Sequence, residues 1–115
     1  MDEKQAVRAL AALGQSVRLK VFRALVVAGE SGLTPGTISD ALGIPAATLS
    51  FHLKELAGAG LVRQERASRH RIYRADYEAM NALLLYLTDH CCEGTVCIDV
   101  PVVTCDTGRT MVEDD

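Results

Sequence analysis

The stretch that decides the fold is residues 34–62, which read TPGTISDALGIPAATLSFHLKELAGAGLV. Thr34 before Pro35 is a typical helix start, because a capping hydroxyl precedes a proline that fits the first turn. Gly43 ends that short helix, and Pro45 can begin the next one only two residues later. Two helices joined by so tight a glycine-containing turn have the sequence outline of a helix-turn-helix.

The second of these helices has one apolar side and one side that suits nucleic acid. Leu49, Leu53 and Leu56 recur at positions i, i+4 and i+7, which predicts a buried stripe. The outward positions hold small, hydroxyl and cationic residues, which can approach base edges and phosphates, although solvation is the alternative for any single one. Phe51 also falls at an outward position, but a phenylalanine is more often core than a DNA contact. The predicted DNA-contacting residues of this helix are Ala46, Ala47, Thr48, Ser50, His52 and Lys54.

Residues 61–75 change to an alternation of apolar and charged side chains, which predicts a two-stranded hairpin with a basic tip. In a winged helix-turn-helix such a hairpin reaches the DNA backbone or the minor groove. The residues expected to make these contacts are Arg66, Arg69 and Arg71. Contacts between arginine and phosphate predict an affinity that falls steeply as salt is added.

Three further helices are predicted, so the expected fold is mainly α, with about five helices plus a two-stranded wing. The expected inner stripes are Ala6, Leu10 and Leu13 in a helix over residues 3–14, and Leu19, Phe22 and Val26 in a helix that Ser16 caps and that runs to residue 28. The last helix, from residue 76 to about residue 90, is apolar on almost all sides. A terminal helix of this kind in so small a protein is best explained by a dimer interface.

Length and composition fit one small globular domain, with 115 residues of which 49% are hydrophobic. The charges are segregated: residues 1–75 hold eleven Lys and Arg against six Asp and Glu, a net +5, whereas residues 76–115 hold one against nine, a net −8. No apolar run is long enough to span a membrane, and the N-terminus lacks the features of a signal peptide. A cytoplasmic location without membrane contact is therefore expected, and there thiols stay reduced.

Three thiols fall within seven residues of the segment His90-Cys91-Cys92-Glu93-Gly94-Thr95-Val96-Cys97. Adjacent cysteines are a poor structural disulfide but a good chelate for a soft ion. A zinc site completed by His90 or Cys105, a disulfide redox switch and inert buried thiols are the alternatives. Because so short a chain shows no substrate cleft, and no helix start follows the cysteines to activate one, neither enzymatic activity nor a catalytic cofactor is expected.

Two stretches resemble the ArsR/SmtB family of metal-responsive repressors. Val17-Arg18-Leu19-Lys20-Val21-Phe22-Arg23-Ala24-Leu25 is similar to the family's second helix. Residues 48–62 resemble its recognition helix and the run into its wing. The similarity covers roughly residues 5–90. It implies a dimeric winged-helix repressor of a metal(loid)-resistance operon that binds double-stranded operator DNA, pairs through its first and last helices, and leaves the operator when a metal or metalloid binds.

Members of this family bind metals at several different places in the fold. The helix over residues 35–42 has no cysteine, and Asp76, Glu78, Asp89 and His90 do not reproduce the zinc spacing of the last helix. Cys91, Cys92 and Cys97 resemble the arsenite site of a subset of arsenic repressors, which implies As(III) or Sb(III) as inducer; zinc, cadmium, lead or redox sensing is the alternative. The expected organisation is a DNA-binding and dimerisation domain over residues 1–90, an inducer-binding segment over residues 91–105 and a disordered acidic tail over residues 106–115.

Overall fold

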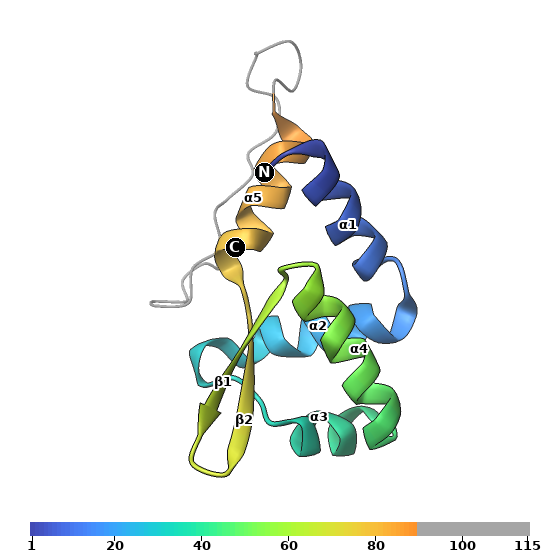
Figure 1. The fold of residues 1–115 in the computed structure, drawn as a ribbon, viewed down its shortest axis with the longest axis vertical. Coiled ribbons are helices and arrows are strands. Elements are labelled where there is room, and N and C mark those ends of the chain that lie inside the picture. Colours follow the sequence, from blue (N-terminus) through green and yellow to red (C-terminus); the bar gives the residue numbers. More distant parts are fainter. Residues whose placement is uncertain (90–115) are drawn as a thin grey trace, which may run out of the picture.

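The computed structural model describes residues 1–89, in which the helices and the hairpin follow in the predicted order (Figure 1). The elements are α1 (Glu3–Leu13), α2 (Ser16–Ala28), the short 3₁₀ helix η1 (Gly29–Ser31), α3 (Pro35–Leu42), α4 (Ala46–Gly58), β1 (Val62–Ala67), β2 (His70–Ala75) and α5 (Tyr77–Thr88). Helices α2, α3 and α4 form the body, and the hairpin projects beside it as a wing. Helices α1 and α5 lie together at the end opposite α3.

The tight turn between α3 and α4 forms from local signals. The hydroxyl of Thr34 caps α3 by accepting a hydrogen bond from the backbone N–H of Thr37 at 3.3 Å. Gly43 ends α3 with φ 68° and ψ 34°, a left-handed conformation that glycine adopts without a Cβ penalty. Pro45 stands at the cap position of α4, one residue before the helix. The chain can therefore reverse from one helix into the next within three residues.

The inner side of α4 is buried in the core. Leu49, Leu53 and Leu56 are almost completely buried, as their spacing predicts. They belong to the same hydrophobic cluster as Leu25 of α2 and Ile38 of α3. Burial contributes about 1.5–3 kcal/mol for each such leucine, so the orientation of α4 about its own axis is strongly determined. The opposite side of α4 is left for solvent or a partner.

The predicted inner stripes of α1 and α2 are partly wrong. Their buried residues are Ala6, Ala9 and Ala12 in α1 and Val21, Phe22 and Leu25 in α2. Leu10 is 43% exposed, because the small alanines let α1 lie close to its neighbours and turn its larger side chains away. Leu19 of α2 is exposed as well, since the buried side of that helix is formed by Val21, Phe22 and Leu25. The predicted cap is also wrong. Gln15, rather than Ser16, caps α2, and its Oε1 accepts from the backbone N–H of Arg18 at 2.8 Å.

The wing is an antiparallel pair of strands in a register that places Ala67 opposite His70 beside the tip. Its base is tied to the body by Leu33. The N–H of Leu33 donates to the carbonyl oxygen of Tyr73 at 3.0 Å, and the N–H of Tyr73 donates back at 2.8 Å. The wing is therefore held directly beside the start of α3.

Candidate nucleic-acid interface

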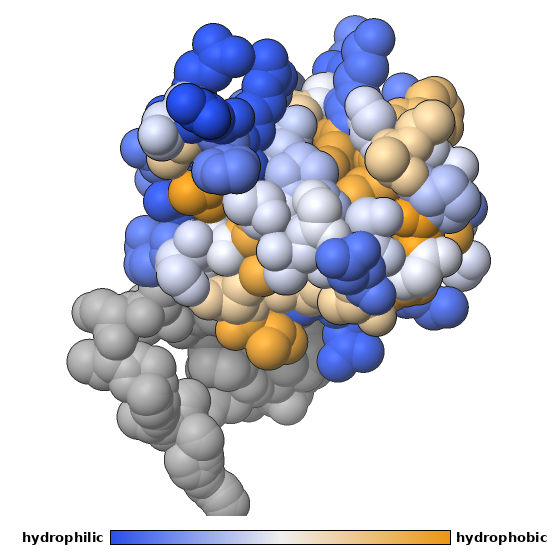
Figure 2. All heavy atoms as spheres, turned by 90° about the horizontal axis from the view of Figure 1, so that it is seen from below, coloured by the Kyte–Doolittle hydropathy of each residue, from blue (hydrophilic) through white to orange (hydrophobic). Residues whose placement is uncertain are grey.

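The outward side of α4 carries five of the six residues predicted to contact DNA from this helix. The exposed residues from its start to its third turn are Ala46, Ala47, Thr48, Ser50, Phe51, Lys54 and Glu55. The start of α4 and the tip of the wing lie at the same end of the molecule (Figure 1). Seen from that end, hydrophilic side chains gather on one side, over the wing, with less polar surface beside them (Figure 2). The arrangement offers a helix and a hairpin to one partner.

His52 is not on this outward side, so the prediction that it faces outward is wrong. Its side chain is 7% exposed and lies on the same side of α4 as the buried leucines. The imidazole Nδ1 lies 3.3 Å from Nη1 of Arg18, and Nε of Arg18 donates to the carbonyl oxygen of Ala12 at 2.7 Å. His52 therefore links α4 to the junction between α1 and α2, which makes it a positioning residue for the helix.

Phe51 is exposed on α4, although the sequence favoured it as a core residue. Its side chain is 56% exposed, and its ring meets the ring of His52 edge-on, with centroids 5.3 Å apart. The signal that could have revealed this exposure is the helical period. At about 100° per residue, Phe51 falls opposite the stripe of Leu49, Leu53 and Leu56, whereas His52 falls at the edge of that stripe, beside Leu56.

The wing brings two arginines together without a carboxylate between them. Arg66 stands directly opposite Arg71 in the register of the strands. Like charges directly opposite each other on a sheet are destabilising, so this pair costs the free protein stability. Arg71 does donate to the amide oxygen of Gln64 at 2.9 Å, which orients the guanidinium without neutralising it. Arg69 is exposed at the turn beside the pair.

The next arginine pair towards the base of the wing is different, because both members have acidic partners. Arg63 stands opposite Arg74. Arg74 pairs with Glu65 at 2.5 Å and also donates to the carbonyl oxygen of Glu30, and Arg63 lies 3.9 Å from Asp76. Within residues 1–89, no carboxylate pairs with the arginines predicted to contact DNA. The uncompensated positive charge is therefore concentrated at the tip of the wing.

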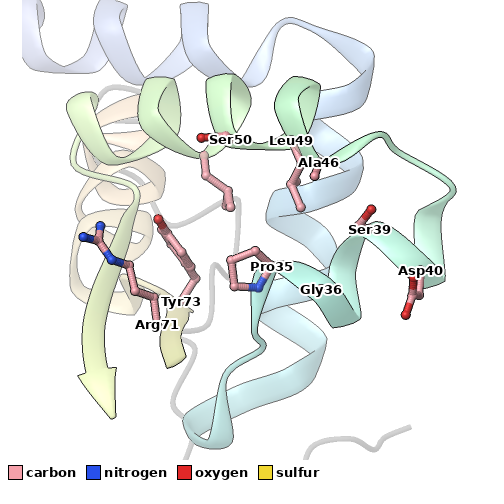
Figure 3. Close-up of a pocket in the computed structure, with 10 residues that line it drawn as sticks. Pro35, Gly36, Ser39, Asp40, Ala46, Leu49, Ser50, Arg71 and Tyr73 are labelled. Carbon is pink, nitrogen blue, oxygen red and sulfur yellow. The ribbon is translucent and has the colours of Figure 1, made fainter. Parts of the chain in front are cut away.

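A groove of about 400 Å³ joins the two parts of this surface (Figure 3). Pro35 of α3, Ser50 of α4, and Arg71 and Tyr73 of β2 line it. Asp40 lies at the α3 end of the groove, where its carboxylate would repel a phosphate. An anionic chain would therefore be held better at the wing end, beside Arg71, than at the α3 end.

The predicted inducer site lies elsewhere in the chain. Cys91, Cys92 and Cys97, together with His90 and Cys105, lie outside the described residues. Within residues 1–89 no group of three or more His, Cys, Asp or Glu side chains could hold a metal ion.

Comparison with known proteins identifies the same architecture. Residues 13–65 match a family model described as a helix-turn-helix domain. The HTH-type transcriptional regulator YgaV of Escherichia coli (strain K12) is 27% identical over 89 residues, which are 77% of this chain and 88% of that protein.

Two solved structures extend the match to the wing. One is an ArsR-like transcriptional regulator from Rhodococcus sp. RHA1, with a TM-score of 0.66 and 23% identity over 73% of this chain and 76% of the other. The second is the homodimeric winged helix-turn-helix DNA-binding domain of Mb0332 from Mycobacterium bovis, a possible ArsR-family transcriptional regulator. Its TM-score is 0.61, with 26% identity over 84% of this chain and 89% of that fragment. The chain has a winged helix-turn-helix fold, and it is similar to ArsR-type regulators.

The predicted fold class is confirmed, with five α-helices and a two-stranded wing in the described residues. YgaV and the Rhodococcus protein are described as transcriptional regulators, which agrees with the prediction that the chain is not an enzyme. In the part of the chain that the structure describes, no helix has the length and apolar character needed to cross a membrane.

Proposed function

We propose that this protein is an ArsR-type repressor of a metal(loid)-resistance operon that acts as a homodimer, and that arsenite or antimonite releases it from operator DNA. The observation that carries the DNA-binding part is the cross-strand pair of Arg66 and Arg71, which has no carboxylate partner within residues 1–89. A polyanion would relieve the repulsion that the free protein bears there. The outward side of α4, beside the same groove, supplies the residues for the major groove.

Each part of the surface would read a different feature of the duplex. Thr48 and Ser50 can donate to bases or phosphates, and Lys54 can meet a phosphate one turn later. Ala46 and Ala47 allow the helix to approach closely. Arg66, Arg69 and Arg71 would hold the backbone beside the groove that α4 enters.

The homodimer is supported by apolar side chains that α1 and α5 leave uncovered. Leu10 on α1 and Leu85 and Leu87 on α5 are exposed, and the two helices contact each other. Apolar side chains gathered on adjacent helices mark an interaction site more often than a free surface. A two-fold dimer through these helices would present two α4 helices to a pseudo-palindromic operator.

The inducer part rests on the chemistry of Cys91, Cys92 and Cys97. Trivalent arsenic and antimony are soft and take three thiolates in a pyramid, so three cysteines within seven residues match that donor set. Zinc would want a fourth ligand, for which His90 or Cys105 is available in the sequence, and cadmium, lead or a disulfide switch would use the same thiols. A cytoplasmic location would keep the thiols reduced and ready to bind.

The thiols are close enough in sequence to α5 to affect it. The helix ends at Thr88, three residues before Cys91. If α5 belongs to the dimer interface, an ion bound at the end of α5 would change how the two subunits meet and hence the spacing of the two α4 helices. Coupling of this size is commonly about 1–3 kcal/mol and reciprocal, so operator DNA should weaken the binding of arsenite.

A titration of fluorescently labelled operator DNA tests the proposal. The complex is titrated in parallel with arsenite, antimonite, zinc, cadmium, lead and peroxide, and release is followed by anisotropy. Arsenite or antimonite should release the wild-type protein at the lowest concentration, and Cys91→Ser or Cys97→Ser should abolish release while leaving DNA binding intact. Cys105→Ser is the matched control and should respond as the wild type does. Unchanged release of the Cys91→Ser protein would overturn the assignment of the site, and release by peroxide alone would favour the redox alternative.

A further inference from the structure

Phe51 is an aromatic side chain that the fold of the monomer does not use. It stands on the side of α4 opposite the buried leucines and is 56% exposed. Its neighbours on that side, one turn away in either direction, are Ala47, Thr48, Lys54 and Glu55. They leave the ring 56% exposed, so it is free to meet solvent or a partner.

The ring nevertheless has a defined contact on one side. It meets the imidazole of His52 edge-on, and that imidazole is itself buried and contacts the guanidinium of Arg18. A side chain whose rotamer is already restricted loses less conformational entropy when it binds. Phe51 is therefore presented outward in a form that suits contact with a partner.

The residues around Phe51 decide what kind of partner fits. An apolar protein surface would need a contiguous apolar patch, yet the surrounding positions are Ala47, Thr48, Ser50, Lys54 and Glu55. Towards the start of α4 these neighbours are small or carry a hydroxyl, and Arg71 lines the groove together with Ser50, so this end of the surface favours a polyanion. In the major groove of DNA, the C5-methyl group of thymine is the apolar group that a phenylalanine can contact.

We propose that Phe51 is a specificity-determining residue that contacts the C5-methyl group of a thymine in each operator half-site. The inference rests on the proposed function, because it requires α4 to enter the major groove. It goes further by naming the base and the atom that α4 reads. The small side chain of Ala47 leaves the room that a phenyl ring needs to reach the base edge.

The test removes the methyl group from the DNA and the ring from the protein in turn. A binding sequence is selected from a random duplex library, and each thymine is then replaced by deoxyuridine, which lacks only the C5-methyl group. For the wild-type protein, one position in each half-site should lose affinity by about fourfold, the effect of one buried methyl-sized group. Phe51→Ala should bind the thymine operator more weakly and lose the distinction between thymine and deoxyuridine. Phe51→Leu should keep part of it.

The controls separate this inference from the proposed function. Val27→Ala truncates a side chain on α2 that is 82% exposed, and it should keep the full thymine preference. Circular dichroism and thermal melting should find Phe51→Ala folded like the wild type, because the side chain is outside the core. If no sequence is selected at all, the proposed function fails and this inference with it. If a sequence is selected but no thymine methyl matters, or if Phe51→Ala keeps the preference, only the role of Phe51 is overturned.

Discussion

Replacing Arg66 with glutamine should make the free protein more stable and its complex with DNA weaker. Arg66 stands opposite Arg71 with no carboxylate partner within residues 1–89. Removing one member of a like-charged cross-strand pair should raise the free energy of unfolding by about 0.2–1 kcal/mol. The same change would remove one phosphate contact from each subunit of a dimer.

The magnitude of the DNA effect follows from counterion release. Each lost phosphate contact lowers the slope of log affinity against log salt by about 0.9, so two contacts per dimer lower it by about 1.8. Between 50 and 200 mM salt, the variant should therefore lose about tenfold less affinity than the wild type does. Anisotropy titrations of the operator over this salt range give the slope, and urea denaturation gives the free energy of unfolding.

Arg74 supplies the matched control on the same hairpin. It already pairs with Glu65 and the carbonyl oxygen of Glu30. Arg74→Gln should therefore lower stability and leave the salt slope nearly unchanged. The reasoning is refuted if Arg66→Gln leaves the slope as it is in the wild type, or if Arg74→Gln lowers it by the same amount.

Two further changes test the base of the wing and the dimer. Gly32 has φ 66°, and an added Cβ would lie 2.7 Å from the carbonyl oxygen of Tyr73, so Gly32→Ala should lower the free energy of unfolding in urea by about 1–3 kcal/mol. Gly36→Ala, where a Cβ meets nothing within 4 Å, should instead be neutral or stabilising, and equal losses at both positions would contradict the assigned strain. Leu87→Glu on α5 should shift the protein from dimer to monomer in sedimentation experiments, whereas Val27→Glu on α2 should not; a dimer that survives Leu87→Glu would place the interface elsewhere.

The parts of the fold that were predictable from sequence are those set by local chemistry. The cap at Thr34, the left-handed glycine at residue 43 and the spacing of Leu49, Leu53 and Leu56 each act within a few residues of the chain. They were enough to locate α3 and α4 and the buried side of α4. The hairpin followed from its alternating pattern and its basic tip.

The exchange of roles between Phe51 and His52 shows where sequence reasoning failed. Residue chemistry suggested a buried phenylalanine and an outward histidine, and the helical period argued the reverse. What makes the buried imidazole tolerable is Arg18, which is 34 residues away in sequence and supplies a polar partner at 3.3 Å. A partner so distant cannot be inferred from the sequence of α4 alone. The residue types therefore favoured Phe51 as the buried residue, where the structure buries His52.

The same distinction explains α1, whose two sides serve different neighbours. Its alanines face inward, so the helix lies close to α2 and α4, while Leu10 and other large side chains remain on the outside. Arg8 of α1 also lies within reach of Gly58 near the end of α4, where an added Cβ would meet its Nη2 at 3.3 Å. Helix α1 carries part of the proposed dimer surface and also contacts α4 directly. Little structure therefore separates the dimer surface from α4 that could absorb a movement. We therefore expect a change in dimer geometry to move α4 as part of a rigid unit, so that an inducer could alter operator spacing without unfolding the wing.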